Sequence, residues 1–152
     1  MHWIIVADAS RARVFSAGET LERFVLEHEI DHPQGRAHTH ELVSDSQGRS
    51  RGSGGPPSAQ PPHTAPHEVE LQRFARSLAA KLRRGRLEGR YERLILAAPP
   101  RFLGALRGAL DPPTLGRVVE SLAHDWTKLA SHELPAIIRR ALPDTAGMPD
   151  AG

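Results

Sequence analysis

A five-residue apolar run that stops at two prolines constrains the fold of this chain more than any other stretch. Leu94 to Ala98 contains no polar residue, and Pro99-Pro100 follow it at once. Such a run is typical of a strand covered on both faces, so it predicts the central strand of an α/β sheet. After the prolines, Phe102, Leu103, Leu106 and Leu110 recur at helical spacing. The segment therefore predicts a buried strand that leads directly into a helix, with Pro100 in its first turn.

Three further strands are predicted near the N-terminus. They span Trp3 to Ala7, Arg11 to Ser16 and Leu21 to Ile30. Because the turns between them are short, the three strands are expected to form an antiparallel meander. Asp8 stands at the first turn, where its side-chain oxygen is expected to cap the backbone before Arg11.

The second half of the chain predicts alternating helices and strands. A helix is expected after Thr64 as N-cap, with Gly85 and Gly89 as stop signals. After the predicted helix that begins at Pro100, we expect a strand over Arg117 to Ala123. A final helix is expected over Ser131 to Leu142, with Ser131 as its cap. The whole order is β-β-β, long loop, α, β, α, β, α. It predicts an α/β fold with a mixed sheet, in the order of the ribonuclease H-like fold.

One domain is expected over residues 1–142, with a disordered tail over 143–152. The segment 31–66 interrupts this domain, because six of the thirteen prolines and five of the thirteen glycines lie there. A structureless insert of this length is typical of a functional or disordered loop. Its central part, GRSRGSGG (48–55), is predicted to be flexible and cationic.

Composition excludes several classes of protein. The chain has no cysteine, so it forms neither a disulfide framework nor a thiolate metal site. The N-terminal apolar run is short and lacks a preceding basic region, and no stretch approaches the roughly 20 apolar residues that span a bilayer. We therefore expect a cytoplasmic protein. The formal net charge is only +2, so the placement of the twenty basic residues is more informative than their sum.

Arginines gather on the predicted helix and in the loop that precedes it. Guanidinium groups engage phosphates without reading sequence, and a glycine-rich loop can follow RNA closely. Arg101, in the first turn of the next helix, is expected either to pair with a nearby carboxylate or to bind an anion together with free N–H groups. The candidate nucleic-acid-binding residues are Arg36, Arg49, Arg51, Arg73, Arg76, Arg83, Arg84 and Arg101.

Catalytic and metal sites have weaker support in the sequence. Six of the nine histidines lie between His28 and His67, but no acidic residue stands at a convincing ligand spacing. A ribonuclease H-type nuclease would need several carboxylates around Mg²⁺, and Asp8 is the only one at the expected place. No serine has a GxSxG-like setting. We expect no metal, no cofactor and no catalytic residue.

The motifs of the chain resemble the bacterial host-attachment protein family, whose members are required for attachment to host cells. The matching segments extend across nearly the whole chain in the right order. They are VADASRARVF (6–15), HPQGR (32–36), ELVSDSQGRS (41–50), RFARSLAAKL (73–82), LAAPPRFLGALR (96–107) and HDWTKL (124–129). The family name describes a phenotype and not a biochemical activity.

The resemblance further implies a distant relation to the central domain of archaeal and eukaryotic peptide-chain release factors. In that domain a Gly-Gly-Gln loop lies between the strand meander and a helix. The corresponding loop tip here is Ser53, Gly54 and Gly55, followed by Pro56 instead of glutamine. Since proline has no backbone N–H, peptidyl-tRNA hydrolysis is in doubt, whereas binding of RNA or the ribosome stays open.

The sequence thus predicts a non-catalytic module that binds RNA or the ribosome. One alternative is a protein-interaction module in surface attachment, with the proline-rich part of the loop as an extended peptide ligand. Another is a metal-dependent nuclease or ester hydrolase that uses Asp8.

Overall fold

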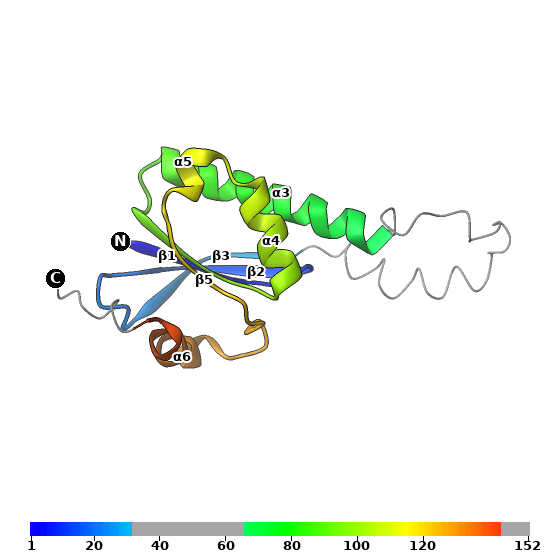
Figure 1. Cartoon of the computed structure of the whole chain (residues 1–152). Helices are drawn as coiled ribbons and strands as arrows, with labels where there is room; N and C mark the ends of the chain where they lie inside the picture. The colour runs from blue at the N-terminus through cyan, green and yellow to red at the C-terminus, as the bar shows by residue number, and fades with distance from the viewer. Residues whose placement is uncertain (32–65, 144–152) are drawn as a thin grey trace, which may run out of the picture.

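Five strands form one mixed sheet in the order β3-β2-β1-β4-β5 (Figure 1). The computed structural model describes residues 1–31 and 66–143. The strands are β1 (His2–Ala7), β2 (Arg11–Ala17), β3 (Phe24–Asp31), β4 (Arg93–Ala97) and β5 (Val118–Leu122). β1, β2 and β3 pair antiparallel, whereas β4 pairs in parallel with both β1 and β5. The predicted meander and the mixed α/β fold class are confirmed.

The strand in the middle of the sheet is β1, and the prediction that gave this place to β4 is wrong. β4 lies between β1 and the edge strand β5. Both strands are buried, β1 throughout and β4 from Leu94 onward. An apolar run indicates that a strand is covered on both faces. Because β1 and β4 are both covered in this way, the run in β4 cannot show which of the two strands is in the middle of the sheet.

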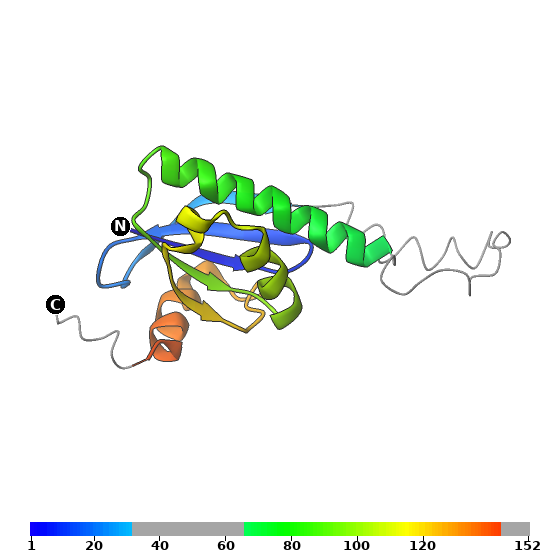
Figure 2. The same cartoon turned by 45° about the horizontal axis from the view of Figure 1, so that its top comes forward.

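Helices cover both faces of the sheet. α3 and α4 lie side by side over one face, and α6 packs against the other (Figure 2). The helices are α3 (Pro66–Leu87), α4 (Pro100–Ala109), α5 (Pro112–Leu115) and α6 (Leu134–Ala141). The single-turn α5 was not predicted. It forms because the Asp111 carboxylate accepts a hydrogen bond from the Thr114 N–H at 3.3 Å, which caps its start.

Alternation along the strands divides the core in two. Trp3 and Ile5 of β1 pack beneath α3 and α4, whereas Ile4 and Val6 pack toward α6. This two-sided burial explains why the first strand reads as continuously apolar. The predicted passage from β4 directly into α4 is also confirmed. Phe102, Leu103 and Leu106 are the buried residues of this helix.

Gly89, but not Gly85, ends α3. Gly89 has a φ of 72°, and the Arg90 N–H donates to the Gly85 carbonyl at 2.9 Å, which completes a Schellman motif. Gly85 lies inside the helix, so its prediction as a stop signal is wrong. A Cβ at Gly85 would lie 2.7 Å from the Trp3 ring, so glycine is required here for close packing.

Two predicted element boundaries also need correction. The third strand begins at Phe24 and not at Leu21, because Leu21 has a φ of 57° and turns the chain. Ser131 does not cap α6: a 3₁₀ turn, Ser131–Glu133, precedes that helix. The Ser131 hydroxyl instead accepts a hydrogen bond from Arg13.

Tyr91 is expected to make the stability of the protein fall at high pH. Its hydroxyl donates to the Leu82 carbonyl at 2.5 Å, and burial raises its pKa to about 12 from an ordinary value of 10. In the unfolded chain the phenol ionises near pH 10 while the folded protein keeps it neutral. The free energy of unfolding should therefore fall by about 2 kcal/mol between pH 10 and pH 12.

The measurement is direct because Tyr91 is the only tyrosine in the chain. Its tyrosinate absorbance should rise well above pH 10 in the folded protein and near pH 10 in urea. Tyr91→Phe should remove both the signal and this part of the pH dependence. A midpoint near 10 in the folded protein would show that the phenol is not held neutral.

Candidate nucleic-acid interface

The outer face of α3 carries a continuous set of cations. From Leu71 to Leu87 the helix contains six basic residues and no acidic one. Its apolar stripe packs on the sheet, so the basic side chains on the opposite side are exposed. Four of them have no ion-pair partner among the described residues. We call these four the cationic face: Arg76, Lys81, Arg83 and Arg84. Lys81 was missed in the sequence, although it follows the same helical spacing.

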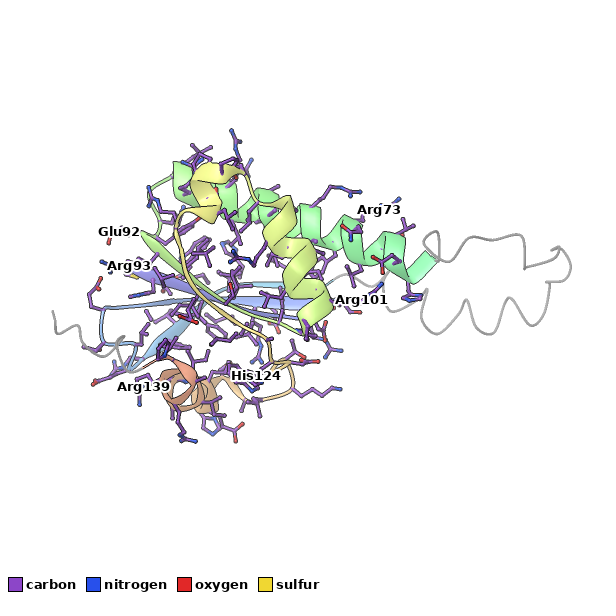
Figure 3. All side chains as sticks on the ribbon, viewed as in Figure 1. Arg73, Glu92, Arg93, Arg101, His124 and Arg139 are labelled. Atoms are coloured by element: carbon purple, nitrogen blue, oxygen red, sulfur yellow. The ribbon has the colours of Figure 1, made fainter. Side chains whose placement is uncertain are left out.

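Two predicted contact residues are engaged with carboxylates. Arg73 Nη1 lies 3.1 Å from Glu70 Oε2 on the same helix. Arg101 forms an ion pair with Glu68 across α3 and α4, which confirms the first of its two interpretations. The hydrogen bond from Arg101 is the main reason why the pKa of Glu68 is lowered. Both guanidinium groups remain at the surface, at the end where α4 begins (Figure 3).

Arg86 belongs to the framework and not to the cationic face. Its side chain is only 15% exposed and points toward α5. Nε donates to Thr114 Oγ1 at 2.9 Å, and Nη2 lies 3.3 Å from Asp111 Oδ2. These bonds tie the last turns of α3 to α5. At the arginine-rich end of α3, Arg86 therefore stabilises the fold, whereas Arg83 and Arg84 are available to a ligand.

A groove of about 460 Å³ runs between α3 and α4 beside the cationic face. Arg76 stands on its α3 side, and small residues form its α4 side. A Cβ added at Gly104 or Gly108 would meet no atom within 4 Å, so the backbone of α4 is open to a ligand there. The groove is lined by Gln72, Arg76, Gly104, Ala105, Gly108 and Ala109.

The predicted loop contacts fall outside the described residues. They are Arg36, Arg49 and Arg51, together with the loop tip Ser53, Gly54 and Gly55. Whether these residues converge with the helix is therefore a prediction. The same holds for the proline-rich peptide ligand of the interaction hypothesis.

Asp8 is engaged in structure at the carboxyl end of β1. Its Oδ1 accepts hydrogen bonds from the backbone N–H groups of Ser10 at 2.8 Å and Arg11 at 3.0 Å, which confirms the predicted turn cap. Its Oδ2 lies 3.2 Å from the Thr127 hydroxyl. Within residues 1–31 and 66–143 no three His, Asp or Glu side chains are grouped as metal ligands. The described residues therefore give no support to the metal-dependent alternative.

A well-anchored loop, residues 123–130, follows β5 at the same end of the sheet. Arg13 of β2 holds it, since Nη2 donates to the backbone carbonyls of Trp126 at 3.3 Å, Thr127 at 3.0 Å and Leu129 at 2.9 Å. Thr127 Oγ1 lies 2.6 Å from Asp125 Oδ1. This arrangement was not predicted, although a cation inside a largely apolar strand was a usable signal.

Fold and surface together define a mixed α/β protein with one strongly cationic helix beside its sheet. A family model described as protein required for attachment to host cells matches residues 3–138. The chain belongs to this host-attachment family, as its motifs predicted. No curated protein matches the chain. The similarity to release factors is not shown by these comparisons and stays a prediction.

The described part of the chain also contains no helix with the length and apolar character that crossing a membrane requires.

Proposed function

We propose that this host-attachment protein binds RNA through the cationic face of α3 and does not catalyse a reaction. The observation that carries the proposal is the charge of that face. Its four exposed cations have no carboxylate partner among the described residues, and no acidic residue interrupts the helix from Leu71 to Leu87. Cations that are not neutralised internally can neutralise the phosphates of a polyanion. The counterions condensed on those phosphates are then released, and this release drives RNA binding.

The groove beside the cationic face supports an extended single strand as the ligand. Arg76 at its side offers a fork of N–H donors to a phosphate. Gly104 and Gly108 let a sugar–phosphate backbone approach the helix closely, because no side chain stands between them and solvent. We infer single-stranded RNA as the ligand from the positive charge of Arg76 together with the open backbone at the two glycines. Ribosomal or transfer RNA is the source that the release-factor resemblance implies.

Removing two charges from the cationic face is expected to weaken RNA binding. Arg83→Gln with Arg84→Gln should lower the affinity for a short fluorescein-labelled single-stranded RNA by roughly tenfold at low salt. The slope of log affinity against log salt should become shallower by about 1.4, since each phosphate contact contributes about 0.7. Fluorescence anisotropy over a salt series measures both quantities.

The matched control removes the same charge elsewhere. Arg23 and Arg140 are exposed and have no ion pair among the described residues. Arg140 belongs to α6, on the other side of the sheet. Arg23→Gln with Arg140→Gln should leave the affinity nearly unchanged. If both double variants weaken binding equally, the effect is one of net charge and the assignment to α3 is wrong. If the wild type binds anionic lipid vesicles but not RNA at low salt, RNA is the wrong ligand.

A further inference from the structure

The loop after β5 presents a stacked pair of aromatic rings to solvent. The rings of His124 and Trp126 lie nearly parallel, with centroids 4.8 Å apart and an interplanar angle of 11°. Trp126 is half-buried and packs against the core beneath α6. His124 is exposed, so the indole supports one face of the imidazole and the other face is directed away from the protein.

The orientation of this pair is held by the backbone around it. Arg13 donates to the carbonyls of Trp126 and Thr127, which fixes the two peptide groups that follow the indole attachment. The Asp125 carboxylate accepts a hydrogen bond from the Thr127 N–H at 3.0 Å, which closes a tight turn with Trp126 at its centre. A ring whose plane is already fixed loses little conformational entropy when a second ring stacks on it.

The pair also lies at the same end of the sheet as Arg101 and the start of α4. β1, β4 and β5 run parallel, so their carboxyl ends meet at one end of the sheet, where α/β folds bind ligands. Figure 3 shows His124 and Arg101 toward this same end, on the two sides of the sheet. The Arg101 side chain is 71% exposed despite its ion pair with Glu68, which leaves guanidinium N–H groups for a phosphate.

We propose that the His124–Trp126 pair is a stacking site for a nucleobase of single-stranded RNA. The inference rests on the proposed function, because α3 would supply the phosphate contacts and this pair the base contact. Every base has a planar face, so the site would take bases without selecting a sequence. Among the residues that the structure describes, the other histidine–tryptophan contact is different. His28 meets Trp3 edge-on at 75°, and the Trp3 ring is only 3% exposed, so no stacking face is offered there.

The test compares oligouridylate with an abasic RNA oligomer of the same length, which has the same phosphates but no bases. The wild type should bind oligouridylate about five- to tenfold more tightly than the abasic oligomer, because stacking on an aromatic side chain favours the base-containing strand. His124→Ala and His124→Lys should bring this ratio close to one, whereas His124→Phe should keep it. His28→Ala is the matched control and should also keep it.

The outcomes separate the two proposals. If wild type binds both oligomers equally, or if His124→Ala keeps the preference, the stacking site is wrong while RNA binding by α3 stands. If His124→Lys keeps the preference, the preference does not come from stacking on an aromatic ring at position 124, which also overturns the inference. If neither oligomer binds at low salt, the proposed function and the stacking site fail together. Arg83→Gln with Arg84→Gln should weaken both oligomers and leave the ratio unchanged.

Discussion

Replacing Arg13 by leucine is expected to lower the free energy of unfolding by about 2–4 kcal/mol, a large effect for a side chain that is not fully buried. Arg13 makes four side-chain hydrogen bonds, three to backbone carbonyls of the 123–130 loop and one to the Ser131 hydroxyl at 3.3 Å. Hydrogen bonds from a charged donor contribute more than neutral ones, and the carbonyls left behind must find water instead. Their contributions are not additive, because all four share one guanidinium group.

The loop itself should respond more strongly than the rest of the protein. Hydrogen exchange of backbone amides in residues 123–130 should speed up in Arg13→Leu, while amides of β1 and β4 keep most of their protection. In Arg13→Lys the exchange rates should lie between those of the wild type and Arg13→Leu. One ammonium group cannot reach all four acceptors that surround the planar guanidinium group. The stacking site would also lose its fixed orientation, so the base preference of RNA binding should fall with it.

Arg11 provides the control for Arg13. It lies two residues away on the same strand, its side chain is 42% exposed, and its Nε forms one ion pair with Asp8 Oδ2 at 3.5 Å. This half-buried pair has a single N–O contact, and the buried Arg11 Nε has no hydrogen-bond partner among the described residues. Such a pair contributes little, so Arg11→Leu should change the free energy of unfolding by less than about 1 kcal/mol. Urea unfolding at neutral pH measures both variants. Equal losses in the two variants would show that Arg13 does not anchor the loop.

The second large effect is expected at Gly85. In an ordinary helix, glycine to alanine raises stability by up to about 1 kcal/mol. At Gly85 the added Cβ would lie 2.7 Å from two carbons of the Trp3 ring and 3.1 Å from Tyr91 Cε2. Neither ring can withdraw, because Trp3 is 3% exposed and Tyr91 is 2% exposed. Gly85→Ala should therefore lower the free energy of unfolding by about 2–3 kcal/mol, since overpacking outweighs the helix propensity.

Gly104→Ala and Gly108→Ala supply matched controls within α4. An added Cβ meets no atom within 4 Å at either position, so each variant should be as stable as the wild type or more stable by up to about 1 kcal/mol. Thermal or urea unfolding of the three variants gives the comparison. If Gly85→Ala is as stable as the α4 variants, the close approach of Trp3 to α3 is wrong.

Gly108→Ala also tests the groove between α3 and α4. The affinity of this variant for RNA should fall, although its stability does not.

Much of the fold was predictable from short-range patterns. The apolar run before Pro99-Pro100 and the stripe of the long helix identified β4, α3 and α4, because burial on a strand or a helix imposes its own spacing. Asp8 was correctly assigned as a turn cap, since its partners are only two and three residues away. The boundary errors had a different origin. Leu21 looks like the start of a strand by composition, but its positive φ depends on the turn in which it lies.

The candidate interface was predicted less completely. The helical spacing identified which arginines of α3 face solvent, and the structure confirms that exposure. It did not show that Arg101 pairs with Glu68 or that Arg86 turns inward to Asp111, because those partners come from other elements. His124 and Trp126 lie in the matching segment HDWTKL (124–129), but the sequence did not predict that their rings stack. The two rings are close in the chain, but their parallel orientation follows from the anchoring of the loop by Arg13.

Hydrophobic spacing and turn residues were thus enough to establish the kinds of elements, their order and the cationic side of the long helix. These depend on interactions between residues a few positions apart, which a linear pattern records. The place of β1 in the middle of the sheet, the contact of Gly85 with Trp3 and the pairing of Arg86 and Arg101 were settled only by packing. Each of these depends on side chains separated by tens of residues, whose meeting no local pattern encodes.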